Sequence, residues 1–124
     1  MHTIAAVLYP QALATSVTLP MEILQAASQM ASAQAPGLTP RVSFLLTGRD
    51  RQPVTLGSGI TLQPQLTFAE LPPLDLLLLP AIWRNPVPAV NGARDWLPLL
   101  QGQAARGTRI CSVGTASYLL AEAG

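Results

Sequence analysis

The side chains with the greatest chemical reactivity are scarce in this chain of 124 residues, which has one cysteine, Cys111, and one histidine, His2. Cys111 lies within an apolar run, where a free cysteine is commonly buried and inert. His2 precedes the first strand-like run, so we expect an exposed residue near the terminus. One cysteine excludes an internal disulfide and a cysteine-rich metal site. With its single histidine near the terminus, the chain shows no Cys-His or Ser-His-Asp constellation. We therefore expect neither a metal nor a cofactor.

The stretch 109–124, RICSVGTASYLLAEAG, is the best candidate for a functional turn. It predicts a buried strand over 109–113, a tight turn at Gly114 and Thr115, and a helix that begins near Ala116. Open α/β sheets bind ligands beyond the carboxyl ends of their strands, and such a turn can hold a nucleophile. At its tip, however, Gly114 has no side chain. Thr115 is expected to cap the helix, or alternatively to line a ligand pocket.

The elements that would position this turn follow from apolar runs and breaks. Continuous apolar runs predict central parallel strands, and helical spacing predicts two longer helices. Strands are expected over 3–9, 41–47, 74–80 and 109–113, helices over 13–32 and 91–106, a hairpin over 52–56 and 60–63, and a single turn, capped by Thr67, over 67–71. This order predicts a three-layer α/β/α sandwich with a mostly parallel, flavodoxin-like sheet and a small hairpin excursion.

Three further residues lie where a ligand could bind. Trp83 and Asn85 fall in a proline-rich loop expected over 81–90, and Trp83 could form a wall of a ligand site or anchor an interface. Glu22 lies early in the first helix, where it could compensate the helix N-terminus or point into a pocket. Nearby, Pro20 predicts either a kink or the first turn of that helix.

The composition narrows the functional classes. The chain is 49% hydrophobic and only 10% charged, with a net charge of +1, whereas soluble domains average about 25% charged residues. A sparsely charged surface indicates that part of it is covered by a partner or by more chain. The charge gives no basic footprint for nucleic acid. No apolar run approaches the length needed to span a membrane, and we expect a cytoplasmic protein.

The sequence SVGTASYLLAEAG, residues 112–124, resembles the elbow segment of the PfpI-type superfamily (class I glutamine amidotransferase-like). AVLYP and TLPMEIL resemble the first strand and helix of that superfamily, and LDLLLLPAIW resembles the strand that normally ends in a glycine pair. The chain is most similar to the amino-terminal domain of AraC-family transcriptional regulators, in which a helix-turn-helix DNA-binding module follows.

The resemblance also assigns positions, and the catalytic residues are missing from them. The nucleophilic cysteine of the family falls on Gly114, its acidic partner on Ser16, and the glycine pair that supplies oxyanion N–H groups on Ala81 and Ile82. We interpret these four positions, with Thr115, as a vestigial active site without catalytic residues. Residues 1–124 would then be an incomplete amino-terminal domain, with the rest of its fold and the DNA-binding module beyond Gly124.

The resemblance implies a non-catalytic domain that senses a ligand or dimerises. We expect a homodimer, a small-molecule effector, DNA contact only through the module absent here, and no membrane association. The residues expected to bind the effector are Ser16, Glu22, Trp83, Gly114 and Thr115. Two alternatives stay open: an enzyme of the same superfamily (a hydratase, a glyoxalase-like enzyme or an amidase) that acts without the cysteine, and a structural scaffold with neither ligand nor chemistry.

Overall fold

A five-stranded parallel sheet forms the centre of the computed structural model, which describes residues 2–37 and 41–124. The strand order is β5-β2-β1-β6-β7, and the strands are β1 (His2–Val7), β2 (Val42–Gly48), β5 (Leu66–Thr67), β6 (Leu76–Leu79) and β7 (Arg109–Ser112). In the middle of the sheet, Ala6 of β1 pairs with Leu46 on one side and Leu78 on the other. The order β2-β1-β6-β7 confirms the flavodoxin-like arrangement.

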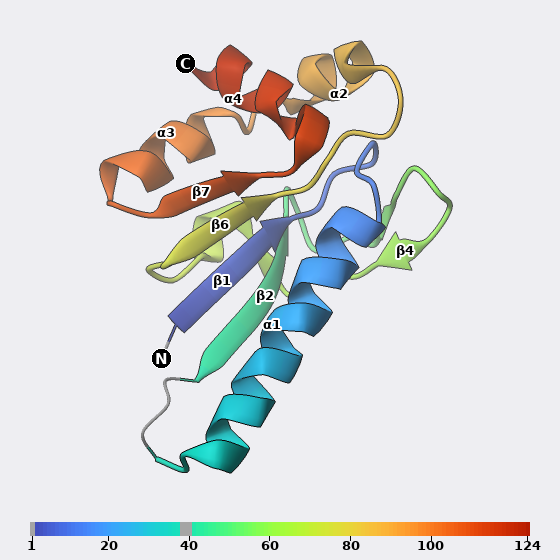
Figure 1. Ribbon diagram of the computed structural model, residues 1–124. Helices are drawn as coiled ribbons and strands as arrows, with labels where there is room; N and C mark the ends of the chain where they lie inside the picture. The colour runs from blue at the N-terminus through green and yellow to red at the C-terminus, as the bar shows by residue number, and fades with distance from the viewer. Residues whose placement is uncertain (1, 38–40) are drawn as a thin grey trace.

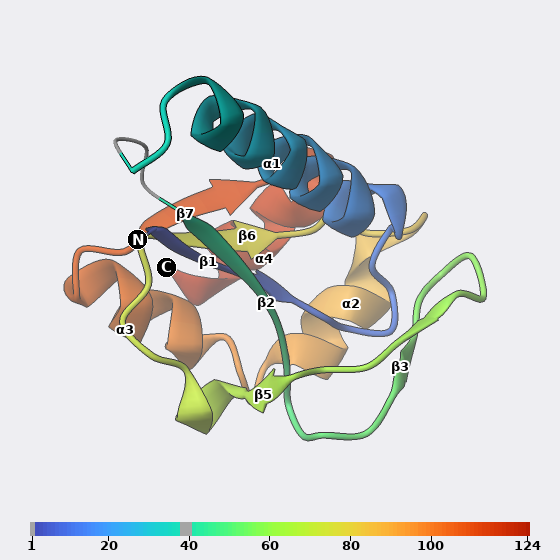
Figure 2. The same ribbon diagram turned by 90° about the horizontal axis from the view of Figure 1, so that it is seen from below.

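Helices cover both faces of this sheet, so the predicted three-layer architecture is confirmed (Figures 1 and 2). Helix α1 (Thr15–Gln34) lies alone on one face, and α2 (Pro86–Ala93), α3 (Pro98–Ala105) and α4 (Ser117–Ala123) lie on the other. The predicted hairpin is also present, as the antiparallel pair β3 (Val54–Thr55) and β4 (Thr61–Leu62). Within the described residues, no helix is both long and apolar enough to cross a bilayer.

The single helix predicted over 91–106 is wrong, and so is the loop predicted over 81–90. The structure has two helices there, and α2 begins inside the predicted loop. Asn85 caps α2 by accepting a hydrogen bond from the Val87 N–H at 3.0 Å. Pro98 then occupies the first turn of α3. A proline lacks the N–H that a continuous helix needs but fits a first turn well, so the chain breaks before Pro98 and restarts there.

Pro20 behaves in the opposite way, because α1 continues through it. Pro20 is the sixth residue of α1, so it does not mark the first turn. Glu22 is the eighth residue, and the first turn of α1 contains no acidic residue. The proposed role of Glu22 in compensating the helix N-terminus is therefore wrong, since the favourable effect of a carboxylate is confined to the first turn.

Short elements follow β4. Strand β5 was not predicted; Gly48 and Thr47 at the end of β2 pair with its two residues. The predicted single turn is the short helix η1 (Phe68–Glu70), and the Thr67 N–H donates to the Glu70 carboxylate at 3.2 Å. Hydrogen bonds from Thr67 lower the pKa of Glu70, as expected for a carboxylate stabilised in its charged form.

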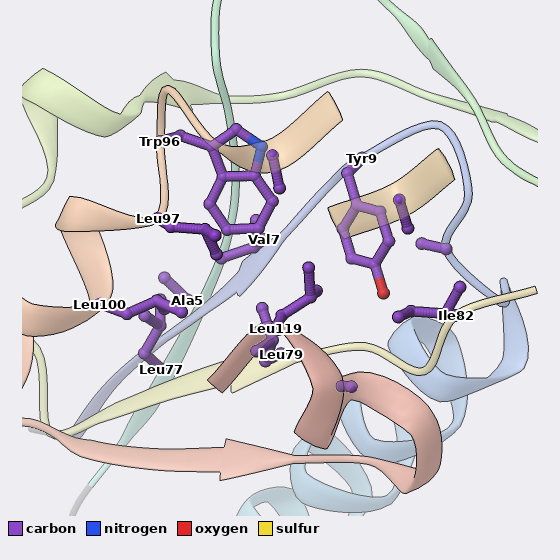
Figure 3. Packing of buried hydrophobic residues seen from close by; sticks show 14 of the residues in the cluster. Ala5, Val7, Tyr9, Leu77, Leu79, Ile82, Trp96, Leu97, Leu100 and Leu119 are labelled. Atoms are coloured by element: carbon purple, nitrogen blue, oxygen red, sulfur yellow. The ribbon is translucent and has the colours of Figure 1, made fainter. Parts of the chain in front are cut away.

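The larger hydrophobic cluster lies between the sheet and helices α2 to α4 (Figure 3). Trp96, Leu97 and Leu100 extend from α3 and the residues before it toward Val7 and Leu77 of the sheet. The smaller cluster lies beneath α1 and includes Val17, Ile4 and Leu78. Because both faces of β1 and β6 are covered, residues 4–7 of β1 and all of β6 are apolar, as the sequence predicted.

Tyr9 sits at the end of the larger cluster, and its buried hydroxyl donates a hydrogen bond to the carbonyl oxygen of Pro80. Its ring centroid lies 6.0 Å from that of Trp96. Burial raises the pKa of Tyr9 far above the ordinary tyrosine value, because a phenolate would lose its hydration there.

We predict that the free energy of unfolding falls as the pH rises above about 10, the ordinary tyrosine pKa. The unfolded chain then loses the Tyr9 proton while the folded chain keeps it, so alkaline pH favours unfolding. The Tyr9→Phe variant should flatten this dependence and lose about 1–2 kcal/mol at neutral pH, because the Pro80 carbonyl is left unpaired. Urea titrations at several pH values measure both effects. Tyr118→Phe, at an exposed tyrosine, is the matched control; an equal change in both variants would contradict the assignment.

Candidate functional site

The predicted elbow between β7 and α4 is present. After β7, the residues of the short helix η2 (Gly114–Ala116) lead directly into α4. Gly114 has a φ of 51°, in the left-handed region that strongly favours glycine. A Cβ atom built on Gly114 would meet only the Ala81 Cβ, at 3.8 Å. The tip of the elbow is therefore sharply bent, exposed and sterically open.

The segment 80–82, which follows β6, faces this elbow and is held by hydrogen bonds from the loop after β1. Leu13 donates its N–H to the Ala81 carbonyl at 2.8 Å, and Ala12 forms an antiparallel bridge with Ile82. Beyond the segment, the Trp83 N–H donates to the Gln11 carbonyl at 2.6 Å. Backbone hydrogen bonds alone therefore hold the segment after β6 in place.

Three hydroxyl groups bind three consecutive residues of this segment, and we call Tyr9, Ser16 and Thr115 the hydroxyl cluster. Tyr9 donates to the Pro80 carbonyl. The Ser16 hydroxyl accepts a hydrogen bond from the Ala81 N–H at 2.9 Å and donates to the Leu13 carbonyl at 2.6 Å. The Thr115 hydroxyl accepts from the Ile82 N–H at 3.0 Å and also contacts the Ile82 carbonyl at 3.2 Å. The strand ends of β1, β6 and β7 are joined through these bonds.

Thr115 therefore does not cap α4, and that expectation is wrong. The residue before α4 is Ala116, and no side chain caps the helix. Thr115 instead lies within η2, and its hydroxyl reaches the residues after the end of β6. Ser16 was predicted as the position of a lost acid and as a residue that binds an effector, and its hydrogen-bond partners could not be identified from the sequence.

The structure brings together five of the predicted site residues: Ser16, Ala81, Ile82, Gly114 and Thr115. Trp83 is next to them in sequence, but its side chain packs against the hairpin, where a Cβ at Gly57 would lie 2.5 Å from it. The guanidinium carbon of Arg84 lies 5.6 Å from the centroid of the Trp83 ring. Glu22 is exposed on α1, and among residues 2–37 and 41–124 it has no ion-pair partner.

Cys111 is exposed, so the prediction of a buried packing cysteine is wrong. Strand β7 is the last strand of the described sheet, and Cys111 pairs with Leu78 on its inner side only. Leu78 belongs to the cluster beneath α1, whereas Cys111 does not. The apolar sequence around Cys111 predicted a strand correctly, but it could not show that the strand lies at an edge. His2, as expected, is exposed.

A cavity of about 500 Å³ lies beyond the carboxyl ends of β1 and β2, and the sequence did not predict it. Its walls include Arg49 and Asp50 after β2, and the rings of Phe68 and Trp96, whose centroids lie 5.6 Å apart. The Arg49 guanidinium is already paired with Asp95 at 2.7 Å. None of the predicted site residues lines this cavity. The one available signal was the charged pair immediately after a buried strand.

The hydroxyl cluster and the elbow lie at the carboxyl ends of the strands of a parallel α/β protein, where ligands bind in such folds, and Gly114 at the tip of the elbow supplies no nucleophile. No residue in the cluster or the elbow carries a charge at neutral pH. In the described part of the chain, no three histidine, cysteine or acidic side chains come together as metal ligands would.

Comparison with known proteins agrees with this class. No family model matches the chain. The chain is 29% identical over 117 residues to an isonitrile hydratase of Pseudomonas putida. This match covers 94% of the chain but only 45% of that enzyme. The chain thus spans about half the length of this curated relative.

Solved structures extend the comparison. A putative transcriptional regulator of Vibrio parahaemolyticus superposes with a TM-score of 0.80 at 17% identity, over 99% of this chain and 61% of that one. A ThiJ/PfpI family protein of Pseudomonas syringae gives 0.76 at 22% identity, over 98% and 46%. An AraC family transcriptional regulator of Pseudomonas putida gives 0.71 at 23% identity, over 100% and 62%. The chain has the fold that DJ-1/ThiJ/PfpI proteins and these regulators share.

We predict that Ser16→Ala and Thr115→Val each lower the free energy of unfolding by about 1–3 kcal/mol, because each leaves a backbone N–H of the 80–82 segment unpaired. The double variant should lose less than the sum, since both hydroxyls hold one segment. Chemical denaturation measures all three. Ser117→Ala, next to the elbow but exposed, is the control, and an equal loss there would contradict the role of the cluster.

Proposed function

We propose that this chain is a non-catalytic ligand-sensing or dimerisation domain of an AraC-type transcriptional regulator. The main observation in support of this proposal is the arrangement of residues at the elbow. Gly114 stands where the resemblance expects a nucleophile, and the N–H groups of Ala81 and Ile82, where it expects oxyanion donors, already bind Ser16 and Thr115. Covalent acyl chemistry needs both a nucleophile and free donors aimed at the developing charge.

The same arrangement favours ligand binding at the elbow. The tip is exposed and has space above Gly114, since a Cβ there meets only Ala81. A small polar ligand could exchange hydrogen bonds with the Thr115 hydroxyl, which is itself held by Ile82. Its binding would change how tightly the ends of β6 and β7 are joined, which is the kind of differential contact that can bias a regulator between two states.

The similarity to the two regulators supports this class over a plain scaffold. In such a protein, DNA contact would belong to a separate helix-turn-helix module, and the effector and the dimer contacts would belong to this domain. The low charge of the chain, with seven Arg and no Lys, six acidic residues and one His, fits a role in assembly better than a role in direct DNA contact.

A thermal-shift screen of the full-length protein against amino acids, amines and small metabolites tests ligand sensing. We predict that at least one compound raises the melting temperature and that Gly114→Asn weakens its apparent affinity about tenfold or more, a cost of about 1.4 kcal/mol. Asparagine tolerates a positive φ, so the new side chain mainly fills the space at the tip.

Gly107→Asn is the matched control, because Gly107 also has a positive φ, 85°, and open space around it. It lies before β7 and away from the elbow, and should leave the ligand response unchanged. No shift with any compound, together with normal promoter binding, would remove the sensing role and leave dimerisation.

The alternative is an enzyme that uses another route, and the similarity to an isonitrile hydratase favours testing it first with isonitriles. We predict no turnover of an isonitrile or of methylglyoxal by the full-length protein above the uncatalysed rate. Product formation is followed by chromatography, with Thr115→Val measured in parallel. Turnover that falls in Thr115→Val would overturn the regulator proposal.

A further inference from the structure

The cavity beyond the carboxyl ends of β1 and β2 has the size and the lining of a small-molecule site. Its volume of about 500 Å³ falls within the range of about 300–1,000 Å³ that is usual for ligand pockets. The apolar part of its wall comes from separate parts of the chain: Leu8 after β1, Val54 in β3, Phe68 in η1, Ala89 in α2 and Trp96 before α3. The cavity is therefore a feature of the fold and not of one loop.

The polar part of the wall carries a negative charge that no cation of the described residues offsets. Arg49 is paired with Asp95, whereas Asp50, the next residue, has no ion-pair partner among residues 2–37 and 41–124. Oδ1 of Asp50 accepts a hydrogen bond from the Gln52 N–H at 2.9 Å. The other carboxylate oxygen, Oδ2, is left to accept a hydrogen bond from a ligand at the rim of the cavity.

A carboxylate ligand would find no free fork on Arg49. A guanidinium holds a carboxylate through two parallel N–H groups, and each of its forks includes an N–H of Nη2. Nη2 of Arg49 already donates to the Gly92 carbonyl at 2.6 Å and to the Asp95 carboxylate at 2.7 Å. Because Asp95 also offsets the charge of Arg49, Asp50 sets the sign of the cavity, which favours a cation over an anion.

We propose that this cavity binds a small primary amine with an aromatic body. The ammonium group pairs with Asp50 and donates a hydrogen bond to its Oδ2, while the body packs against Phe68 and Trp96. The centroids of these two rings lie 5.6 Å apart, so they form one aromatic surface. Aromatic rings pack well against one another, and they also attract ammonium groups.

This site goes beyond the ligand site proposed at the elbow. None of the elbow residues, Gly114 to Ala116, lines the cavity, and neither does Ser16. The cavity lies at the ends of β1 and β2, whereas the elbow follows β7 at the other side of the sheet. The two sites can therefore be tested one at a time.

Isothermal titration calorimetry of the full-length protein with three probes tests the chemistry of the site. 2-Phenylethylamine has the ring and the ammonium group, 3-phenylpropionate has the same ring and chain with a carboxylate, and ethylamine lacks the ring. We expect 2-phenylethylamine to bind about tenfold or more tightly than either of the others, because only it uses both parts of the wall. No binding of this amine, or equal binding of the amine and the carboxylate, would overturn the proposal.

Asp50→Asn tests the ion pair, because asparagine keeps an oxygen for the Gln52 N–H and removes only the charge. We expect it to weaken 2-phenylethylamine about fivefold, as for an exposed pair of charges. Asp75→Asn is the matched control: Asp75 also accepts a backbone N–H, from Thr3 at 2.7 Å, but it lies before β6 at the amino end of the sheet. The control should bind the amine like the unmodified protein, and an equal loss in both variants would contradict the role of Asp50.

Gly92→Leu tests the cavity itself. Gly92 lines it from α2, and a Cβ built there meets nothing within 4 Å. The variant should therefore fold, take up part of the space and weaken the amine about tenfold, as crowding of an apolar site does. Gly102→Leu is the control, since Gly102 lies in α3 with equally open space and does not line the cavity. Equal affinities of the two variants would place the amine outside the cavity.

Gly114→Asn separates this site from the elbow. We expect that variant to bind 2-phenylethylamine normally. A loss in Gly114→Asn with none in Asp50→Asn would place the amine at the elbow, which overturns the cavity site and supports ligand sensing there. Amine binding that weakens in Asp50→Asn, in a protein whose promoter binding ignores the amine, would support the cavity site and leave sensing to the elbow.

Discussion

The hydrogen bonds from Tyr9, Ser16 and Thr115 to residues 80–82 are the contacts on which the candidate site depends. The three side chains come from the end of β1, the start of α1 and the elbow after β7. A buried N–H or C=O must find a partner, because the penalty for leaving it unpaired exceeds the gain from a typical hydrogen bond. The hydroxyl cluster meets this requirement with neutral groups, and so no charge has to be buried at the strand ends.

The central strands could be predicted from the sequence because burial on both faces makes them largely apolar. This held for β1, β2 and β6, whereas the parallel sheet was predicted from the alternation of strands with helices. The same signal failed at Cys111, because an apolar run does not reveal whether a strand has neighbours on both sides. Strand β5 was missed for a related reason: two residues are too few for a periodic pattern.

The two prolines that lie inside predicted helices have different effects on the structure. Pro20 is accommodated within α1, whereas Pro98 begins a new helix. The sequence analysis predicted a kink or a first turn at Pro20 and an unbroken helix across Pro98. A proline disfavours an unbroken helix at either position, and tertiary context decides the outcome at each. At the candidate site the bent, glycine-tipped elbow was predictable from its local sequence. The partners of Ser16 and Thr115 were not, because their hydrogen bonds join residues 65 and 33 positions apart in the chain.

Helix α1 ties the candidate site to the smaller hydrophobic cluster. Ser16 lies in its first turn and accepts a hydrogen bond from the Ala81 N–H, while Val17, the next residue, packs in the cluster beneath α1. Neighbouring residues of a helix project in directions about 100° apart, so one turn of α1 can contact both the site and the core. Both residues are buried. The packing of α1 on the sheet therefore sets the position of the Ser16 hydroxyl, and a change in that packing would be felt first at the Ala81 N–H.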